Sequence, residues 1–174
     1  MTMHSVHLLT PQQVPARRNA LVDLLVDAVE GGASVGFVWP MTRTKALAWW
    51  EDTLASHARG ERLIFTGEAQ GRLDGTVQLI PTPKENQAFR ADLSKLLVRT
   101  SARRQGLGAM LMRAAEEEAR RIGRTLLTLD TEVGSTAERL YMRLGWTKYG
   151  EIPAYATSPD NRSRDAVSFF YKTL

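Results

Sequence analysis

Two arginines and two glycines stand together where an apolar run meets the start of a helical pattern. The run Leu96-Leu97-Val98 ends there, and the segment Arg103-Arg104-Gln105-Gly106-Leu107-Gly108 follows shortly after it. Glycine allows a tight turn and lets a ligand approach the main chain without a Cβ in the way. The start of a helix presents unpaired N–H groups and the positive end of the helix dipole, which favour an anion such as a phosphate. The sequence therefore predicts a strand that leads into an anion-binding turn at the head of a helix.

The spacing of these glycines excludes two common nucleotide sites. A Rossmann dinucleotide site requires a third glycine and an acidic residue about 20 positions later, within a βαβ unit. The third glycine is missing here. A phosphate loop of the Walker type requires Gly-Lys followed by Ser or Thr, which is also missing. The motif that remains to be explained is Arg-x-x-Gly-x-Gly, with Arg103 three residues before Gly106.

The composition limits the available chemistry. The chain has no cysteine, which excludes disulfides, thiolate metal sites and a cysteine nucleophile. Its three histidines are scattered and argue against a histidine-based metal site, so no metal is expected. The formal net charge is +4, from 23 basic and 19 acidic residues that are dispersed along the chain. Because the one dense basic patch lies on the anion-binding turn, we expect a phosphate-bearing ligand rather than nucleic acid.

The length and hydropathy of the chain favour a single domain over residues 1–174. No apolar run approaches the roughly 20 residues that span a bilayer. The first residues lack the basic start and apolar core of a signal peptide. We therefore expect a cytoplasmic protein that does not associate with a membrane.

Periodicity and turn residues predict seven strands and four helices. Strands are expected at 6–9, 62–69, 73–80, 88–98, 125–131, 146–149 and 167–172, and helices at 14–29, 42–59, 107–122 and 135–144. An irregular stretch that holds Pro153 and Pro159 is expected between the last two strands. This order of elements implies an α/β domain with a mixed sheet.

The helix predicted over 107–122 contains a carboxylate that its apolar face does not accommodate. The buried stripe is expected to comprise Leu107, Leu111, Ala114, Ala115 and Ile122. Glu118 falls near the middle of that stripe, where an unpaired buried carboxylate is costly. We therefore expect the head of Glu118 to reach the rim of the core or a basic partner.

Arg103-x-x-Gly106-x-Gly108 is similar to (Gln/Arg)-x-x-Gly-x-(Gly/Ala), the signature of the GNAT superfamily of acyl-CoA-dependent N-acetyltransferases. A second segment, Ala137-x-x-Leu140-Tyr141-x-x-x-Gly145-Trp146, resembles the family motif Ala-x-x-Leu-Tyr-x-x-x-Gly-Phe, with Trp in place of Phe. The resemblance implies a mixed, mostly antiparallel sheet of about seven strands, flanked by about four helices. The sheet would splay between the fourth and fifth strands. The resemblance also implies acetyl-CoA as the acetyl donor.

The same resemblance assigns residues to the acetyl donor. Main-chain N–H groups from Arg103 through Gly108 would hold the pyrophosphate of acetyl-CoA, and the strand Leu96-Leu97-Val98 would hydrogen-bond the pantetheine arm. Where many members have an asparagine that contacts the cofactor, this chain has Gly134-Ser135. The expected cofactor contacts are Leu96, Leu97, Val98, Arg103, Arg104, Gln105, Gly106, Leu107, Gly108, Ala109 and Ser135.

Acetyl transfer to an amine sets three chemical tasks. An alkylammonium, with a pKa near 10, must lose a proton to a base. The thioester oxygen must be polarised and the leaving thiolate protonated. The family analogy gives the oxygen to the main-chain N–H of Val98, an oxyanion-hole arrangement, and the thiolate proton to Tyr141. Asp130 is the candidate base or ammonium anchor. Without a cysteine, direct attack in a ternary complex is the expected route.

Two of these residues also have a purely structural interpretation. Tyr141 can be a core side chain, because Ala137, Leu140, Tyr141 and Leu144 form one apolar helical face. Asp130 can cap a helix or pair with a nearby arginine. The sequence leaves both interpretations open.

Three further segments resemble the tabtoxin-resistance acetyltransferases, which acetylate the amine of a β-lactam toxin. They are GGASVGF (residues 31–37), LDTEVGS (129–135) and GEIPAYATSPDNR (150–162). The implied acceptor is the primary amine of a small molecule, either amino-acid-like or a β-lactam toxin or antibiotic. The expected acceptor contacts are Ser34, Phe37, Trp39, Asp130 and Glu132.

The same resemblance leaves two alternative functions open and suggests an oligomeric state. A protein or peptide N-acetyltransferase is an alternative within the family. A CoA-binding regulatory protein that has lost catalysis is an alternative of another class. Dimers are common among members of the family, which makes a homodimer the assembly to test.

Overall fold

The structure is a computed structural model, and it describes residues 3–174. The strands are β1 (Ser5–Leu8), β2 (Leu63–Ala69), β3 (Arg72–Pro81), β4 (Arg90–Val98), β5 (Leu126–Glu132), β6 (Thr147–Thr157) and β7 (Arg164–Thr173). The helices are α1 (Val14–Glu30), α2 (Arg43–Ala58), α3 (Leu107–Arg121) and α4 (Thr136–Arg143). Single 3₁₀ turns cover Pro11–Gln13, Glu85–Gln87 and Thr100–Ala102. Within the described residues, the predicted strands and helices are all present and in the predicted order.

Local sequence signals explain where the helices begin. Pro15 lies in the first turn of α1, where its missing N–H would have no partner inside the helix. Thr42 caps α2, since its side-chain oxygen accepts a hydrogen bond from the Lys45 N–H at 3.2 Å. Gly106 precedes α3 with a φ of 86°, in the left-handed region that glycine adopts without steric cost.

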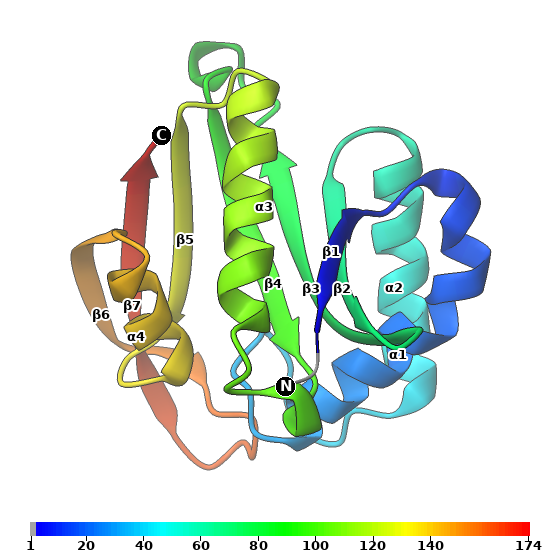
Figure 1. Ribbon diagram of the computed structural model, residues 1–174. Coiled ribbons are helices and arrows are strands. Elements are labelled where there is room, and N and C mark those ends of the chain that lie inside the picture. Colours follow the sequence, from blue (N-terminus) through cyan, green and yellow to red (C-terminus); the bar gives the residue numbers. More distant parts are fainter. Residues whose placement is uncertain (1–2) are drawn as a thin grey trace.

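The strands form one sheet in the order β1-β2-β3-β4-β5-β7-β6 (Figure 1). All neighbouring strands pair antiparallel except β4 and β5, which pair parallel. The mixed, mostly antiparallel seven-stranded sheet expected from the sequence is therefore confirmed.

The parallel pair is hydrogen-bonded over only a short length. Arg90–Asp92 of β4 pairs with Leu126–Thr128 of β5, and no further residues pair. Beyond this point the two strands diverge toward their carboxyl ends (Figure 1). We call the unpaired segments, residues 93–98 of β4 and 129–132 of β5, the β4–β5 fork. Each of these strands keeps one main-chain edge free of the other in the fork, as the predicted splay requires.

A β-bulge in β4 lies at the start of the fork. Thr76 and Gln78 of β3 pair with Leu97 and Ser94, so two residues of β4 face the single residue between them on β3. One of these two residues of β4, Lys95, has a φ of 52°. The bulge changes which residues of β4 point to each face of the sheet.

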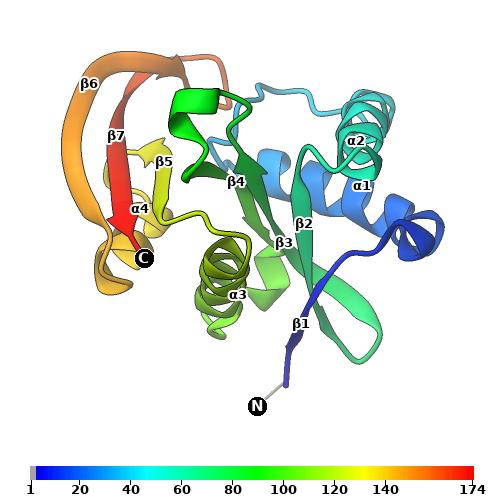
Figure 2. The ribbon, with the colours of Figure 1, turned by 90° about the horizontal axis from the view of Figure 1, so that it is seen from above.

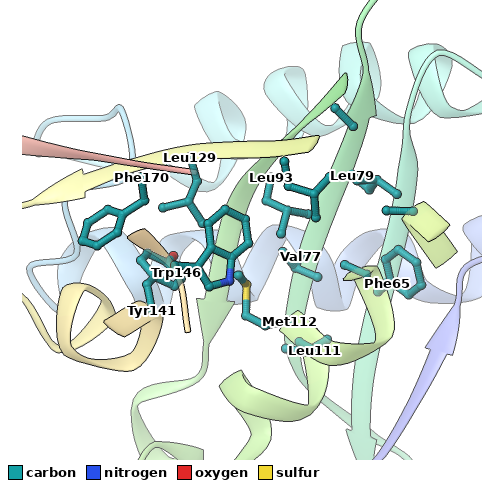
Figure 3. Close-up of a cluster of buried hydrophobic side chains, with 14 of the residues drawn as sticks. Phe65, Val77, Leu79, Leu93, Leu111, Met112, Leu129, Tyr141, Trp146 and Phe170 are labelled. Atoms are coloured by element: carbon teal, nitrogen blue, oxygen red, sulfur yellow. The ribbon is translucent and has the colours of Figure 1, made fainter. Parts of the chain in front are cut away.

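Helices cover both faces of the sheet, α3 on one and α1 with α2 on the other (Figure 2). The core under α3 includes Phe65, Val77, Leu111, Met112, Tyr141, Trp146 and Phe170 (Figure 3). The core under α1 and α2 includes Leu21, Leu25, Trp50, Ile64 and Leu97. Burial of these apolar side chains is the main force that fixes the helices on the sheet.

The sixth strand is longer than the sequence predicted. It extends to Thr157 instead of ending at Tyr149, and it includes Pro153. Proline removes a ladder hydrogen bond, which is tolerated on an edge strand or at a bulge. Strand β6 is the edge of the sheet, and its register breaks between Ile152 and Ala156. Both conditions are met, so the irregular stretch predicted there was wrong over residues 150–157.

The set of residues that α3 buries also differs in part from the predicted set. Ala114 and Ile122 are only partly buried, whereas Met112 and Ala119 are fully buried. Glu118 lies at the rim, where its carboxylate pairs with Arg121 at 2.5 Å, as expected for a residue that needed a basic partner.

Glu116 is the carboxylate that α3 buries. It is 5% exposed and accepts hydrogen bonds from Trp146 Nε1 at 2.9 Å and from Lys172 Nζ at 2.8 Å. A buried indole N–H requires an acceptor, which a phenylalanine at the same place would not. The Trp in place of Phe in the second motif is therefore matched by Glu116.

Among residues 3–174, no helix is long and apolar enough to cross a membrane. No cluster of three or more His, Asp or Glu side chains that could hold a metal ion occurs in that range either.

Candidate active site

The turn after β4 presents a row of free main-chain N–H groups. Arg104 has a φ of 63° and Gly106 a φ of 86°, and α3 starts directly after them. None of the N–H groups from Arg104 to Ala109 donates a hydrogen bond to any described residue. Consecutive N–H groups in left-handed turns form a concave anion site, and the helix dipole adds positive potential. This geometry can hold a diphosphate.

Hydrogen bonds from nearby segments of the same chain hold this turn in place. The Asp27 carboxylate at the end of α1 accepts hydrogen bonds from the Thr100 N–H at 2.7 Å and from Thr100 Oγ1 at 3.1 Å. Arg103 Nε donates to the Val98 carbonyl at 3.2 Å. A Cβ on Gly31 would stand 3.1 Å from Thr100 Oγ1. The sequence analysis did not identify Asp27, because nothing in α1 marks it as the partner of a turn more than 70 residues away.

The predicted cofactor contacts differ in how far they are exposed. The side chains of Arg103, Arg104 and Gln105 are exposed around the turn. Leu97 and Leu107 are each 1% exposed, so only their main chain is available to a ligand. Gly106 is exposed as well, and the remaining predicted contacts are partly buried: Leu96, Val98, Gly108, Ala109 and Ser135.

Gly108 brings three elements close together. A Cβ at this position would stand 3.2 Å from Leu140 of α4 and 3.9 Å from Val98 at the end of β4. The first contact is tighter than an ordinary van der Waals contact. A side chain here would therefore push α4 away from the start of α3, and α4 carries Tyr141.

Tyr141 is 6% exposed, with its ring centroid 6.2 Å from that of Trp146 and 6.0 Å from that of Phe170 (Figure 3). Burial raises the pKa of the Tyr141 phenol well above its usual value, and the negative charge of Asp130 raises it further. The phenol is therefore protonated at neutral pH and can donate a proton. The structure thus shows that Tyr141 is a core side chain. Its nearness to Asp130 is also compatible with a role as the proton donor.

Asp130 approaches the fork from the other face of β5. Leu127 and Leu129 belong to the core under α3, so alternation directs Asp130 to the opposite face. Its side chain is open to solvent, yet enough protein surrounds it that desolvation raises the pKa of its carboxyl. The positive charge of Lys95 lowers that pKa and the negative charge of Asp92 raises it. A carboxylate with a raised pKa is a better base than a free one.

Glu132 and Ser135, two other predicted site residues, differ in whether their side chains are already hydrogen-bonded within the fold. Glu132 is partly buried, and desolvation together with the charge of Asp165 raises the pKa of its carboxyl. Ser135 caps α4, where its Oγ accepts from the Glu138 N–H at 3.0 Å and lies 3.2 Å from Thr131 Oγ1. The Ser135 hydroxyl is therefore already engaged in positioning α4.

The loop of residues 31–40 carries the predicted acceptor residues. Ser34 and Phe37 are partly buried, and the Phe37 ring meets Trp49 edge-on at 5.5 Å. Trp39 is 43% exposed, but its indole N–H donates to the Val29 carbonyl at 2.7 Å. Lys95 of β4 lies over the ring of Phe37.

Lys95 is the residue at the fork that the sequence analysis missed. Its Nζ lies 5.6 Å from the centroid of Phe37 and 5.7 Å from that of Trp49. The sequence signal that could have pointed to Lys95 is the occurrence of a lysine within the apolar strand segment 93–98. Alternation alone gives no reason to place it beside the loop of residues 31–40.

A cavity of about 490 Å³ lies between α1 and the β2–β3 turn. Three arginines line it, but carboxylates already pair with them. Arg17 bonds to Glu68, whereas Arg72 and Arg99 face Asp74. Because each of these arginines already faces a carboxylate, the cavity is a weaker candidate for an anion site than the turn after β4.

Comparison with known proteins decides the family. Residues 18–146, most of the chain, match the family described as Acetyltransferase (GNAT) family. The chain belongs to this family. A segment of 112 residues is 37% identical to an uncharacterized N-acetyltransferase from the hisH-hisA intergenic region of Azospirillum brasilense. That segment covers 63% of this chain and 65% of the relative, so the match spans less than two thirds of the relative's length.

Solved structures share the GNAT fold of the chain over nearly its whole length. The ribosomal-protein-alanine N-acetyltransferase of Brucella melitensis superposes with a TM-score of 0.77 at 24% identity, covering 98% of this chain and 99% of that one. An Acinetobacter baylyi protein superposes with a TM-score of 0.81 at 17% identity, covering 100% and 93%. The protein yncA of Salmonella typhimurium, solved with its cofactor acetyl-CoA, gives 0.75 at 20% identity, covering 98% and 94%. At these identities the likeness establishes the fold.

Proposed function

We propose that this chain is an acetyl-CoA-dependent N-acetyltransferase that acetylates the primary amine of a small molecule by direct attack in a ternary complex. The observation that carries the proposal is the row of free N–H groups from Arg104 to Ala109, placed at the mouth of the β4–β5 fork. Membership of the GNAT family and the Salmonella relative solved with acetyl-CoA support the choice of donor.

The residues at the turn and the fork fit acetyl-CoA. The free N–H groups, with Arg103 and Arg104 beside them, would hold its pyrophosphate. The open edge of residues 96–98 would pair with the amide groups of the pantetheine arm, as a strand pairs with an extended peptide. When bound, acetyl-CoA supplies a thioester whose carbonyl carbon bonds to the amine nitrogen as the carbon–sulfur bond breaks.

Three residues of this chain would perform the proton and charge transfers. Asp130, directly or through water, takes the proton that makes the amine nucleophilic. The main-chain N–H of Val98 donates a hydrogen bond to the carbonyl oxygen while negative charge develops there. Tyr141, whose pKa burial raises, gives its proton to the leaving sulfur. Glu132 is the second carboxylate that could anchor the amine.

The loop of residues 31–40 supports a compact acceptor. It leaves α1 beside the anion-binding turn, and the Trp39 N–H donates to the Pro159 carbonyl in the β6–β7 loop at 2.7 Å. The loop therefore connects the two sides of the sheet across the fork, as its path in Figure 2 illustrates. The segments that resemble tabtoxin-resistance acetyltransferases make the amine of a β-lactam dipeptide-like compound the first acceptor to try.

The experiment is an acceptor screen that follows release of the free CoA thiol. Calorimetry first establishes whether acetyl-CoA binds. Small amines and β-lactam-containing dipeptide-like compounds are then compared with peptides of free N-terminus. Turnover with small amines supports the proposal, and turnover with peptides alone favours a peptide N-acetyltransferase. Tight acetyl-CoA binding without any turnover favours a regulatory CoA-binding protein. Single-domain organisation, a homodimer and a cytoplasmic location are proposed on the sequence alone.

A further inference from the structure

Lys95 occupies a special position in β4. Ala91 and Leu93 belong to the core under α3, and so do Leu96 and Val98 further along the strand. Two residues separate Leu93 from Leu96 instead of the one that simple alternation requires. The bulge accommodates this extra residue, and Lys95 adopts a φ of 52° within it. The bulge thus directs Lys95 away from the core under α3 and toward the face that carries Asp130.

The ammonium group of Lys95 is partly enclosed by aromatic rings. Its Nζ lies over the rings of Phe37 and Trp49, at 5.6 and 5.7 Å from their centroids. A Cβ added to Gly36 would stand 3.3 Å from the same atom. This enclosure lowers the pKa of Lys95 through desolvation. The charge of Arg62 also lowers that pKa, and the charge of Asp130 raises it.

No described residue accepts a hydrogen bond from Lys95 or forms an ion pair with it. An ammonium group has three donors, and those of Lys95 remain available to a ligand that carries acceptor oxygens. Lys172, the other partly buried lysine among the described residues, is paired, and so is the exposed Lys148. Lys148 bonds to Glu138 and Glu151, and Lys172 bonds to Glu116. Lys95 therefore differs from the lysines that serve the fold.

Opposite charges face each other across the fork. Lys95 stands on β4 and Asp130 on β5, close enough for each charge to shift the pKa of the other group, yet they form no ion pair. A ligand that carries a carboxylate and an ammonium at a short separation would complement both. An α-amino acid or a β-amino acid has this arrangement, whereas a simple amine and an internal peptide segment do not.

We propose that Lys95 binds the carboxylate of an amino-acid-like acceptor, so that the acceptor's amine is directed toward Asp130. Lys95 is then a specificity-determining residue that selects acceptors with a free carboxylate beside the amine. This inference rests on the proposed function and narrows its acceptor to one chemical class.

The test compares two matched series of acceptors. The twenty proteinogenic L-amino acids and their carboxamides are incubated with acetyl-CoA, and release of the CoA thiol gives kcat/KM for each. The ratio of acid to amide, compared between enzymes, cancels the difference in amine basicity between the series. The wild-type enzyme should prefer the acids. Lys95→Met should lower that ratio by about 10- to 100-fold, mainly through KM, because a charge-assisted hydrogen bond is lost.

Two further variants act as controls. Lys95→Arg keeps the positive charge and should recover part of the preference. Lys45 also lies near the Phe37 ring, at 6.0 Å, but its side chain is exposed and its Nζ donates to the Val38 carbonyl. Lys45→Met should therefore leave the acid-to-amide ratio unchanged. Thermal unfolding and the Kd of acetyl-CoA establish that each variant folds and binds the donor.

Several outcomes would overturn the inference. They are an equal loss for acids and amides in Lys95→Met, a wild-type enzyme without preference for the acids, or acetyl-CoA binding with no reaction of any free amino acid. Acetylation of amines that lack a carboxylate, with all amino acids unreactive, would reject this inference and keep the proposed function. Absence of both acetyl-CoA binding and thiol release would instead reject the proposed function.

Discussion

Substitution of Gly106 by alanine tests the anion-binding turn with little disturbance elsewhere. Gly106 has a φ of 86°, and no atom lies within 4 Å of the position that its Cβ would take. The added methyl group therefore causes no clash, and the only direct effect on the fold is the left-handed backbone, at about 1–2 kcal/mol. At about 2–4 °C per kcal/mol for a chain of this size, the Tm should fall by about 2–8 °C.

Binding of acetyl-CoA should be affected more strongly than stability. The new methyl group would occupy open space beside the free N–H groups of Arg104 to Ala109, where the pyrophosphate is proposed to bind. A hydrogen bond to a charged group contributes about 1.5–3 kcal/mol. Loss of one such bond weakens binding by about 10- to 100-fold, since each 1.4 kcal/mol is about a factor of ten.

Gly123 provides a matched control at the other end of α3. Its φ is 75°, and a Cβ there would also meet nothing within 4 Å. Gly123→Ala should lower the Tm by a similar amount and leave the Kd of acetyl-CoA unchanged. Calorimetric titration and thermal unfolding of both variants give the two quantities. Wild-type affinity in a folded Gly106→Ala protein, or an equal loss of affinity in Gly123→Ala, would refute the assignment of the donor to this turn.

Three further predictions concern the proton donor, the base and the buried network of α3. Tyr141→Phe should lower kcat by about 10²- to 10⁴-fold with an unchanged Kd for acetyl-CoA, and full turnover would remove the phenol from the mechanism. In a pH profile, kcat/KM should decline as the pH falls through the pKa of Asp130, which lies above its ordinary value; in Asp130→Asn this acid limb should disappear. Glu116→Gln leaves the Lys172 ammonium without its carboxylate and should destabilise the fold by about 3–5 kcal/mol in chemical denaturation. Because Lys172→Met removes the orphaned charge, the double variant should regain part of that loss.

The features that the sequence predicted correctly are those that depend on neighbouring residues. Gly106 marks the start of α3 because glycine adopts its φ without cost, and this requirement is local. The seven strands and four helices likewise follow from periodicity and turn residues within short windows. The splay between the fourth and fifth strands came from the resemblance of two motifs to a known family, since periodicity alone does not order strands in a sheet.

The features that the sequence did not predict depend on distant partners. Whether Glu116 or Glu118 is buried depends on a rotation of α3 by a fraction of a turn, which Trp146 and Lys172 decide. The length of β6 depends on its place at the sheet edge, where Pro153 is tolerated. Lys95 was missed for the same reason, because the face that it points to is set by its register with β3.

The short β4–β5 pairing explains how two groups on opposite faces of the sheet can serve one reaction. Tyr141 packs in the core under α3, whereas alternation puts Asp130 on the other face. In a continuous ladder, two hydrogen-bonded strands would separate them. Here the ladder ends at Asp92 and Thr128, and the charge of Asp130 shifts the pKa of Tyr141. The fork thus allows Asp130 on one face and Tyr141 on the other to approach the same space, as their proposed roles of base and acid require, and the bulge in β4 directs Lys95 toward the face of Asp130.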